Sequence, residues 1–255
     1  MFGSSRHRKT CGGNGPKSPS TSDGAAGSGS FFLSIGIKRV SLEGSKLTGL
    51  QKEFLEAFFS REERFFLTGG AALAGFHLGH RETHDLDLFT LSDALDDGFA
   101  LSSGIARQFG ASVESIETSP DFRRFLLRRG LDAVVIDLVR DRVVQRVDDK
   151  PVVHGIRVDP PEEILSNKLC ALLSRSEVRD LVDVRALEMA GYRVEDALPA
   201  AKLKDSGLTP AQLGWVLSEI TLGDDLVPPG NVSAEELREY LADLTTRLAR
   251  IAFPG

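Results

Sequence analysis

The feature that most constrains this chain is the segment from Leu67 to Phe89, which reads LTGGAALAGFHLGHRETHDLDLF. It places a Gly69-Gly70 pair fifteen residues ahead of two aspartates, Asp85 and Asp87. Alternate residues of a strand point to the same face, so these two carboxylates share one side while the leucines between and after them point into a core. The segment predicts a strand, a glycine turn, a short helix and a second strand with an acidic face.

A third carboxylate, Asp137, lies in the middle of the apolar run AVVIDLV, from Ala133 to Val139. An unpaired carboxylate in a buried strand costs a great deal of free energy, so Asp137 needs a partner. A neighbouring strand that carries Asp85 and Asp87 with bound Mg²⁺ would supply one, because Mg²⁺ prefers oxygen ligands. The alternative is a structural ion pair with an arginine such as Arg124.

The two glycines stand between a predicted strand and a predicted helix. Glycine lets the backbone approach a phosphate closely, and a helix N-terminus favours negative charge. Ordinary turns use glycine as well. The position of Gly69 and Gly70 directly ahead of the acidic strand favours phosphate binding.

The order of elements predicts an α+β fold, with a mixed sheet and flanking helices followed by an all-helical region. Residues 1–30 are rich in Gly, Ser and Pro and are expected to form a disordered tail, residues 31–158 the core, and residues 159–255 a helical C-terminal domain. Strands are expected at 31–40, 65–68, 85–89, 111–117, 122–128, 133–139 and 152–158. Helices are expected at 71–78, 100–109, 162–174, 178–190, 210–221 and 234–251.

Three helix starts carry the spacing of a capping box, in which the N-cap side chain and the side chain three residues later satisfy each other's backbone. The pairs are Thr48 with Gln51, Asp159 with Glu162, and Ser233 with Glu236. The helix that begins after Thr48 is expected to bury Leu50, Phe54, Ala57 and Phe58.

Composition points to a cytoplasmic protein. No run of eighteen apolar residues exists, which argues against a membrane span, and no apolar stretch follows the basic cluster Arg6–Lys9, which argues against a secretory signal. Cys11 and Cys170 do not read as a disulfide pair, as expected in a reducing compartment. The net charge of −6 argues against a general nucleic-acid coat protein but allows a local basic surface.

Four motifs in order resemble those of nucleotidyltransferases of the DNA polymerase β-like superfamily, specifically the AbiEii/AbiGii toxin family. The resemblance covers about Phe65 to Asp183. The motifs are Gly69-Gly70-Ala71-Ala72-Leu73, Arg81-Glu82-Thr83-His84-Asp85-Leu86-Asp87, Lys168, and Arg175 with Arg179-Asp180-Leu181-Val182-Asp183. One departure is Ala71, where the family usually has a hydroxyl residue that could hydrogen-bond a phosphate.

The resemblance implies a metal-dependent, toxin-like enzyme that moves a nucleoside monophosphate from a nucleoside triphosphate to an RNA, such as tRNA, or to a protein. It implies a cognate antitoxin as a partner, and no membrane. Asp85, Asp87 and Asp137 would be the catalytic residues and would hold two Mg²⁺ ions, with Mn²⁺ as a possible substitute.

The resemblance also implies a set of nucleotide-binding residues: Gly69, Gly70, Arg81, Lys168, Asp180 and Asp183. Two alternatives stay open here. Asp180 and Asp183, three residues apart on one helical face, could instead form an ion-pair network with Arg175, Arg179 and Arg185. Arg81 is either a phosphate contact or a structural partner for the aspartates.

Other patterns support alternative hypotheses about RNA binding, metal binding and the acceptor. Four arginines around Phe125 could follow an RNA backbone or could line a solvated strand face: Arg123, Arg124, Arg128 and Arg129. His77, His80 and His84 suggest zinc, although Gly79 interrupts the helix that would group them. The same carboxylates would also serve an aminoglycoside-type enzyme with a small-molecule acceptor, or remain in a non-catalytic nucleotide-binding scaffold.

Overall fold

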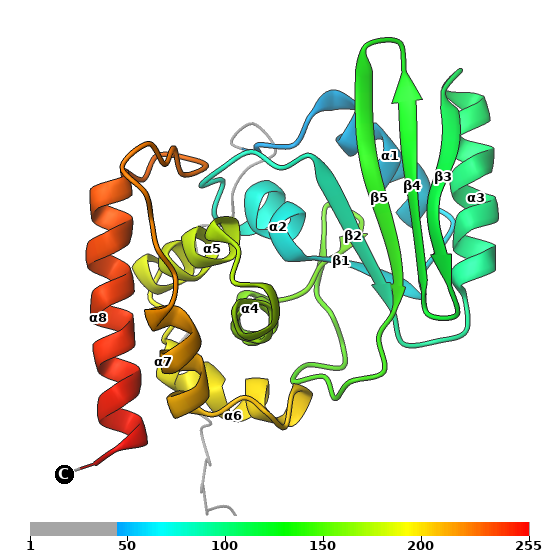
Figure 1. Ribbon diagram of the computed structural model, residues 1–255. Coiled ribbons are helices and arrows are strands. Elements are labelled where there is room, and N and C mark those ends of the chain that lie inside the picture. Colours follow the sequence, from blue (N-terminus) through cyan, green and yellow to red (C-terminus); the bar gives the residue numbers. More distant parts are fainter. Residues whose placement is uncertain (1–44, 255) are drawn as a thin grey trace, which may run out of the picture. The chain divides into compact units, whose positions relative to one another are not determined.

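The computed structural model describes residues 45–254. A five-stranded mixed sheet runs in the order β1-β2-β5-β4-β3 (Figure 1). β2 and β5 are parallel, and the other neighbours are antiparallel. The strands are β1 (Phe65–Thr68), β2 (Asp85–Thr90), β3 (Ser112–Ser119), β4 (Phe122–Arg129) and β5 (Asp132–Arg140).

One face of the sheet is covered by α1 (Gly49–Phe59) and α3 (Leu95–Gln108), as Figure 1 shows. Aromatic side chains fill this layer: the Phe54 and Phe58 rings stack, and Phe58 meets Phe65 of β1 edge to face. Burial of these rings removes a large apolar area from water and fixes α1 against the sheet. The opposite face of β2 and β5 is therefore free to carry polar side chains.

The helical half follows the sheet. Its first helix, α4, packs against the short helix α2 (Gly69–Ala72) of the glycine turn and against α5, α6 and α7. α7 and α8 lie side by side (Figure 1). The helices are α4 (Pro161–Arg175), α5 (Val178–Met189), α6 (Val194–Lys204), α7 (Pro210–Ser218) and α8 (Ala234–Ala252).

Several predicted features are confirmed. The capping boxes at Thr48 and Ser233 both form, with the N-cap hydroxyl accepting from the backbone and the N3 side chain accepting in return. Leu50, Phe54 and Phe58 are buried, as the helical spacing predicted. The five strands of the sheet lie within two residues of their predicted limits.

Other predicted boundaries are wrong. Helix α3 begins at Leu95 rather than Ala100. The helix predicted from Ala71 begins at Gly69 as α2 (Gly69–Ala72) and continues as a π-helical turn, η2 (Leu73–His77). Helix α6 was missed because Pro199, which removes a backbone donor, lies inside it.

The region around Asp159 also differs from its prediction. Residues 152–158 form a small hairpin, β6 (Val152–Val153) with β7 (Ile156–Arg157), because His154 and Gly155 both take the positive φ of a tight turn. The N-cap of α4 is Pro160, with no side-chain cap. Asp159 does not cap this helix because its carboxylate bonds the Thr68 hydroxyl and Lys150 instead.

Three predictions concern residues outside the described range: the tail over 1–30, the strand over 31–40, and the state of Cys11. The domain boundary at Asp159 stays a prediction. Cys170 is a free thiol. Among residues 45–254, no helix combines the length and apolarity that crossing a membrane requires.

Candidate active site

The three predicted carboxylates lie on the two central parallel strands. Asp87 on β2 stands opposite Asp137 on β5, and Asp85 stands opposite Val135. Asp137 is 5 % exposed, whereas Asp85 and Asp87 are partly exposed. Side chains of residues in register on adjacent strands point to the same face, so the sheet brings Asp137 beside Asp87 although fifty residues separate them.

Asp85 is oriented by its neighbours. The Thr83 hydroxyl donates to Asp85 Oδ1 at 2.7 Å. The Gln51 side-chain amide of α1 donates in turn to the Thr83 carbonyl oxygen at 3.0 Å. The segment before β2 is therefore anchored to α1, and the Asp85 carboxylate keeps a defined direction.

Asp87 lies in a strongly negative environment. Loss of solvation, followed by the charges of Asp85 and Asp137, raises the pKa of Asp87 to about 7. Lys168 and Arg175 act in the opposite direction. Further positive charge close to this carboxylate would favour its ionised form.

The glycine turn lies directly against this carboxylate. Gly69 has a φ of +64°, and a Cβ there would come within 2.2 Å of Asp87 Oδ2. A Cβ on Gly70 would come within 2.6 Å of Arg81 Nη2. A side chain at either glycine would therefore have to displace Asp87 or Arg81, and the start of α2 lies against the acidic centre.

Two arginines engage two of the carboxylates. Arg124 of β4 binds Asp137 with both arms of its guanidinium, at 2.8 Å for Nε and 2.6 Å for Nη2. Arg179 of α5 approaches Asp85 Oδ2 with Nη1 at 3.4 Å. The ion pair that the sequence offered as an alternative partner for Asp137 is thus present.

A buried ion cluster joins the sheet to the helical half. Asp183 of α5 accepts from Arg81 Nε at 2.6 Å and from Arg81 Nη2 at 2.8 Å. His80 Nε2 and Lys168 Nζ each lie 2.7 Å from the same carboxylate. Burial alone would raise the pKa of Asp183, but Lys168 and the hydrogen bonds from Arg81 and His80 hold it far below its usual range.

Lys168 bridges Asp183 and Asp180. Its ammonium lies 2.7 Å from Asp180 Oδ1, while Arg175 Nε donates to Asp180 Oδ2 at 2.8 Å. Burial opposes the charge of Lys168, but both carboxylates raise its pKa, so the ammonium stays protonated. Asp180 thus joins the lysine and arginine motifs in one network.

Two cavities flank the acidic strand. The first, here called the nucleotide cavity, has a volume of about 560 Å³ and brings together the predicted Gly69, Asp87 and Lys168. Arg175 and Lys204 add positive charge to its lining. Asp141 and Asp205 also line it, so three cationic side chains face three carboxylates, and the lysines and arginine beside the glycine turn suit a polyphosphate.

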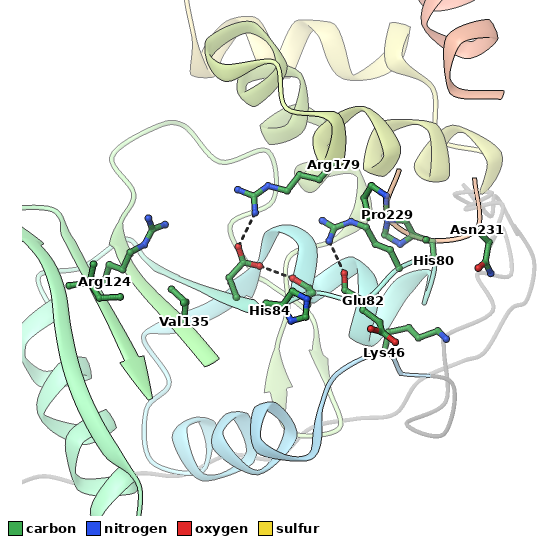
Figure 2. A pocket seen from close by; sticks show the side chains of 14 residues that line it. Lys46, His80, Glu82, His84, Arg124, Val135, Arg179, Pro229 and Asn231 are labelled. Atoms are coloured by element: carbon green, nitrogen blue, oxygen red, sulfur yellow. Dashed lines mark hydrogen bonds and ion pairs between the residues drawn. The ribbon is translucent and has the colours of Figure 1, made fainter. Parts of the chain in front are cut away.

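The second cavity, here called the outer cavity, has a volume of about 910 Å³. Figure 2 shows Arg124 and Val135 on its sheet side and Arg179 on its helix side. Asp85 lines this cavity, whereas Asp87 lines the nucleotide cavity. The two residues of one Asp-x-Asp motif therefore border different spaces.

The carboxylates suit hard divalent cations such as Mg²⁺, because they offer only oxygen ligands and because Asp87 needs compensating positive charge. Within residues 45–254, no three His, Cys, Asp or Glu side chains converge as they would around a bound metal ion. Arg124 and Arg179 hold two of the three carboxylates instead. The same observation disfavours zinc at the histidines: His80 contacts Asp183, and His77 Nε2 lies 2.7 Å from the Asp159 carbonyl oxygen.

Sequence reasoning missed the support beneath the glycine turn. The Thr68 hydroxyl donates to Asp159 at 2.6 Å, and Lys150 binds both Asp159 at 2.8 Å and Glu163 at 3.4 Å. Lys204, which lines the nucleotide cavity, also binds Glu163. These contacts join residues far apart in sequence, so no local sequence pattern predicts them.

Three of the four arginines around Phe125 bind acids rather than standing free. Arg123 pairs with Asp96 and Arg129 with Glu53, besides the Arg124–Asp137 pair. Arg128, near the C-terminal end of β4, is exposed to solvent. RNA contact by this group stays a prediction.

A mixed sheet that presents two aspartates of one strand beside a third on the next, against a glycine turn and a cavity lined by lysines and an arginine, is the arrangement of a nucleotidyltransferase. The chain belongs to the nucleotidyl transferase AbiEii toxin family of type IV toxin–antitoxin systems, whose sequence model matches residues 53–251. Among curated proteins, none matches the chain.

Two crystal structures from Helicobacter pylori share the fold. JHP933 is 19 % identical with a TM-score of 0.53, and the match covers 79 % of this chain and 89 % of that protein. A protein described as a candidate nucleotidyltransferase is 17 % identical with a TM-score of 0.54, covering 79 % of this chain and 92 % of the other. At these identities the likeness concerns the fold alone.

Proposed function

We propose that this nucleotidyltransferase uses divalent cations to move a nucleoside monophosphate from a nucleoside triphosphate to an RNA or protein acceptor in the cytoplasm. One observation carries the proposal: Gly69 and Lys168 line the same cavity as Asp87, and Asp87 is in register with Asp137. Groups suited to a polyphosphate therefore lie beside one proposed cation ligand, Asp87, which in turn stands opposite a second, Asp137.

Each group has a role in this proposal. Gly69 and Gly70 hold the phosphates against the start of α2, and Lys168 with Arg175 offsets the charge of the triphosphate. Asp85, Asp87 and Asp137 would hold two Mg²⁺ ions, and Asp137 would help to withdraw the acceptor's proton. Bound cations supply positive charge at the transferring phosphoryl group and at the departing pyrophosphate. The acceptor oxygen bonds to the α-phosphorus as the bond between the α- and β-phosphates breaks.

Arg81, Asp180 and Asp183 act indirectly in this proposal. Arg81 and Asp183 are bound to each other, and Asp180 holds Lys168 and Arg175 at the cavity wall. Their contribution to nucleotide binding is therefore the placement of Lys168 and of the segment that precedes β2.

The test is transfer of label from each α-³²P nucleoside triphosphate, with Mg²⁺, to total tRNA, to protein or to an aminoglycoside in separate reactions. We expect label in the RNA or protein reaction, lost with EDTA and in Asp87→Asn. Asp132→Asn, an exposed aspartate at the start of β5, is the matched control and should retain transfer. Label in the aminoglycoside reaction alone would show that the acceptor is a small molecule and not RNA or protein. Nucleotide binding without transfer to any acceptor would favour a non-catalytic scaffold.

Membership of a toxin–antitoxin family supports a cognate antitoxin as a partner. We expect the antitoxin to abolish the toxicity of the wild-type protein in a growth assay. Asp87→Asn should be non-toxic without it. Toxicity of Asp87→Asn equal to that of the wild type would separate the toxic effect from transfer.

A further inference from the structure

The outer cavity holds two arginines that the transfer reaction does not otherwise use. Arg124 comes from β4 and Arg179 from α5, so they stand on different walls of the cavity (Figure 2). Each side chain is 41 % exposed. Both guanidinium groups are therefore accessible to a ligand in the cavity, even though each is bound to a carboxylate.

The carboxylates that they contact include two of the three proposed cation ligands, and Arg179 also pairs with Glu177 at 2.5 Å. Arg124 covers both oxygens of Asp137, and Arg179 stands 3.4 Å from Asp85 Oδ2. A guanidinium and a divalent cation cannot share the same carboxylate oxygens at full strength. Occupation of Asp137 and Asp85 by cations would therefore weaken both contacts, which frees the Arg124 guanidinium and the Nη1 end of Arg179 for a ligand in the cavity.

The rest of the outer cavity suits a nucleotide. Ile116 lies at the register shift in β3, and it is 54 % exposed. A β-bulge re-aims the side chain of its extra residue. Together with Val135 and Pro229, Ile116 gives the cavity apolar surface on which a base can rest. The volume of about 910 Å³ leaves room for a chain end rather than a single small group.

We propose that Arg124 and Arg179 form a cation-released clamp for the phosphates of an RNA chain end in the outer cavity. Without divalent cations, each arginine neutralises a carboxylate. With cations on these carboxylates, both guanidinium groups bind RNA. The clamp rests on the proposed function, and it makes acceptor binding and cation binding mutually supportive, as linkage requires.

The first test measures RNA binding without any nucleoside triphosphate, so that transfer cannot contribute. A fluorescein-labelled single-stranded RNA is titrated with the full chain in KCl and in MgCl₂ at equal ionic strength, and anisotropy is recorded. Mg²⁺ normally weakens electrostatic binding of RNA because it competes for the phosphates. The clamp predicts the opposite sign, with tighter binding in Mg²⁺. Weaker binding in Mg²⁺, or none in either salt, would overturn it.

Single substitutions identify the residues. Arg124→Gln and Arg179→Gln should each weaken RNA binding in Mg²⁺ on the order of tenfold, the effect of losing one charge-assisted hydrogen-bond partner. Arg128→Gln, an exposed arginine on the same strand that lines neither cavity, is the matched control. Equal losses in all three variants would show non-specific electrostatic binding and no clamp.

A second readout tests whether cations and the arginines compete for the same carboxylates. Mn²⁺ affinity, measured by calorimetry, should rise in Arg124→Gln because the competing guanidinium is gone, and an unchanged or lower affinity would contradict the exchange between cation and arginine. Asp137→Asn should bind RNA tightly without Mg²⁺, beyond any gain in the charge control Asp132→Asn. Arg179→Gln keeps the test decisive if Arg124→Gln does not fold, since Arg179 is 41 % exposed and its substitution removes only the 3.4 Å contact with Asp85 and a pair with the partly exposed Glu177. If the wild-type protein binds RNA more tightly in Mg²⁺ but transfers no label to any acceptor, the proposed function is refuted and the clamp is still supported.

Discussion

Gly69 and Asp87 are in such close contact that the first glycine of the turn has no room for a side chain. A Cβ would stand 2.2 Å from the carboxylate oxygen Oδ2. The contact ties the shape of the turn to the position of the carboxylate, and each constrains the other. The glycine is thus required by Asp87 as well as by its own φ of +64°.

Gly69→Ala should remove nucleotide binding, because the new methyl group must displace Asp87 or shift the turn. The positive φ adds about 1–3 kcal/mol of strain. Gly110→Ala is the matched control, since Gly110 has the same φ of +64° with nothing within 4 Å of its added Cβ. Nucleotide titrations and thermal unfolding of both variants isolate the contact from the strain. Equal nucleotide affinity in the two variants would contradict the role of the Asp87 contact.

Asp183→Asn should cost about 3–5 kcal/mol of unfolding free energy at neutral pH, because it leaves Arg81 and Lys168 buried beside a neutral partner. Asp243→Asn breaks an exposed pair with Arg247 and should cost at most about 1 kcal/mol. Urea denaturation of both variants measures the difference. A small cost at Asp183 would show that the buried cluster contributes little to stability.

The same carboxylate predicts a pH dependence. The pKa of Asp183 is lowered in the folded state from the value of 3.8 for an unperturbed aspartate, so its contribution is complete above that value and declines as pH falls below it. The slope from this one group is at most about 1.4 kcal/mol per pH unit. We expect the stability difference between the wild type and Asp183→Asn to shrink below pH 3.8. A difference that stays constant into acid would contradict the lowered pKa.

Arg175→Gln should weaken nucleoside triphosphate binding on the order of tenfold, because it removes a cation from the nucleotide cavity. The effect should appear in KM more than in kcat if Arg175 contacts the triphosphate equally in the ground and transition states. Arg193→Gln, an exposed arginine with a 3.6 Å contact to Glu195, is the control. An unchanged KM in Arg175→Gln would place the phosphates elsewhere.

Thr68→Val should destabilise the protein by about 1.5–3 kcal/mol, because the hydroxyl donates to the buried Asp159 carboxylate beneath the turn. Thr118→Val on the exposed strand β3 changes the same atoms in solvent and should have a much smaller effect. Thermal unfolding compares them. Equal stabilities would show that Asp159 is satisfied by Lys150 alone.

The local patterns predicted the sheet well because each of its strands is marked by composition. Alternation fixed the faces of Asp85 and Asp87, and the apolar run around Asp137 placed it on a buried strand. Helix α6 was missed because Pro199 argues against a helix locally, whereas packing against α4 stabilises it. Tertiary contacts overrode the local preference there.

The side-chain partners could not be predicted in the same way. For Arg81 the predicted alternative of a structural partner for the aspartates is confirmed, but the pattern did not single out Asp183, 102 residues away, as that partner. Asp159 has the spacing of a helix cap, yet Thr68 and Lys150 take its carboxylate. Such choices depend on how distant segments meet, which periodicity and capping patterns do not encode.

The buried cluster around Asp183 bears on how the chain can be divided. A fragment that ends at residue 158 would retain all three carboxylates and both glycines of the turn. It would also leave the Arg81 guanidinium without the counter-ion that α5 supplies, next to Gly70 at the start of α2. We therefore expect that the sheet with its three carboxylates does not fold stably by itself, and that a truncated or grafted version of this enzyme has to include α4 and α5.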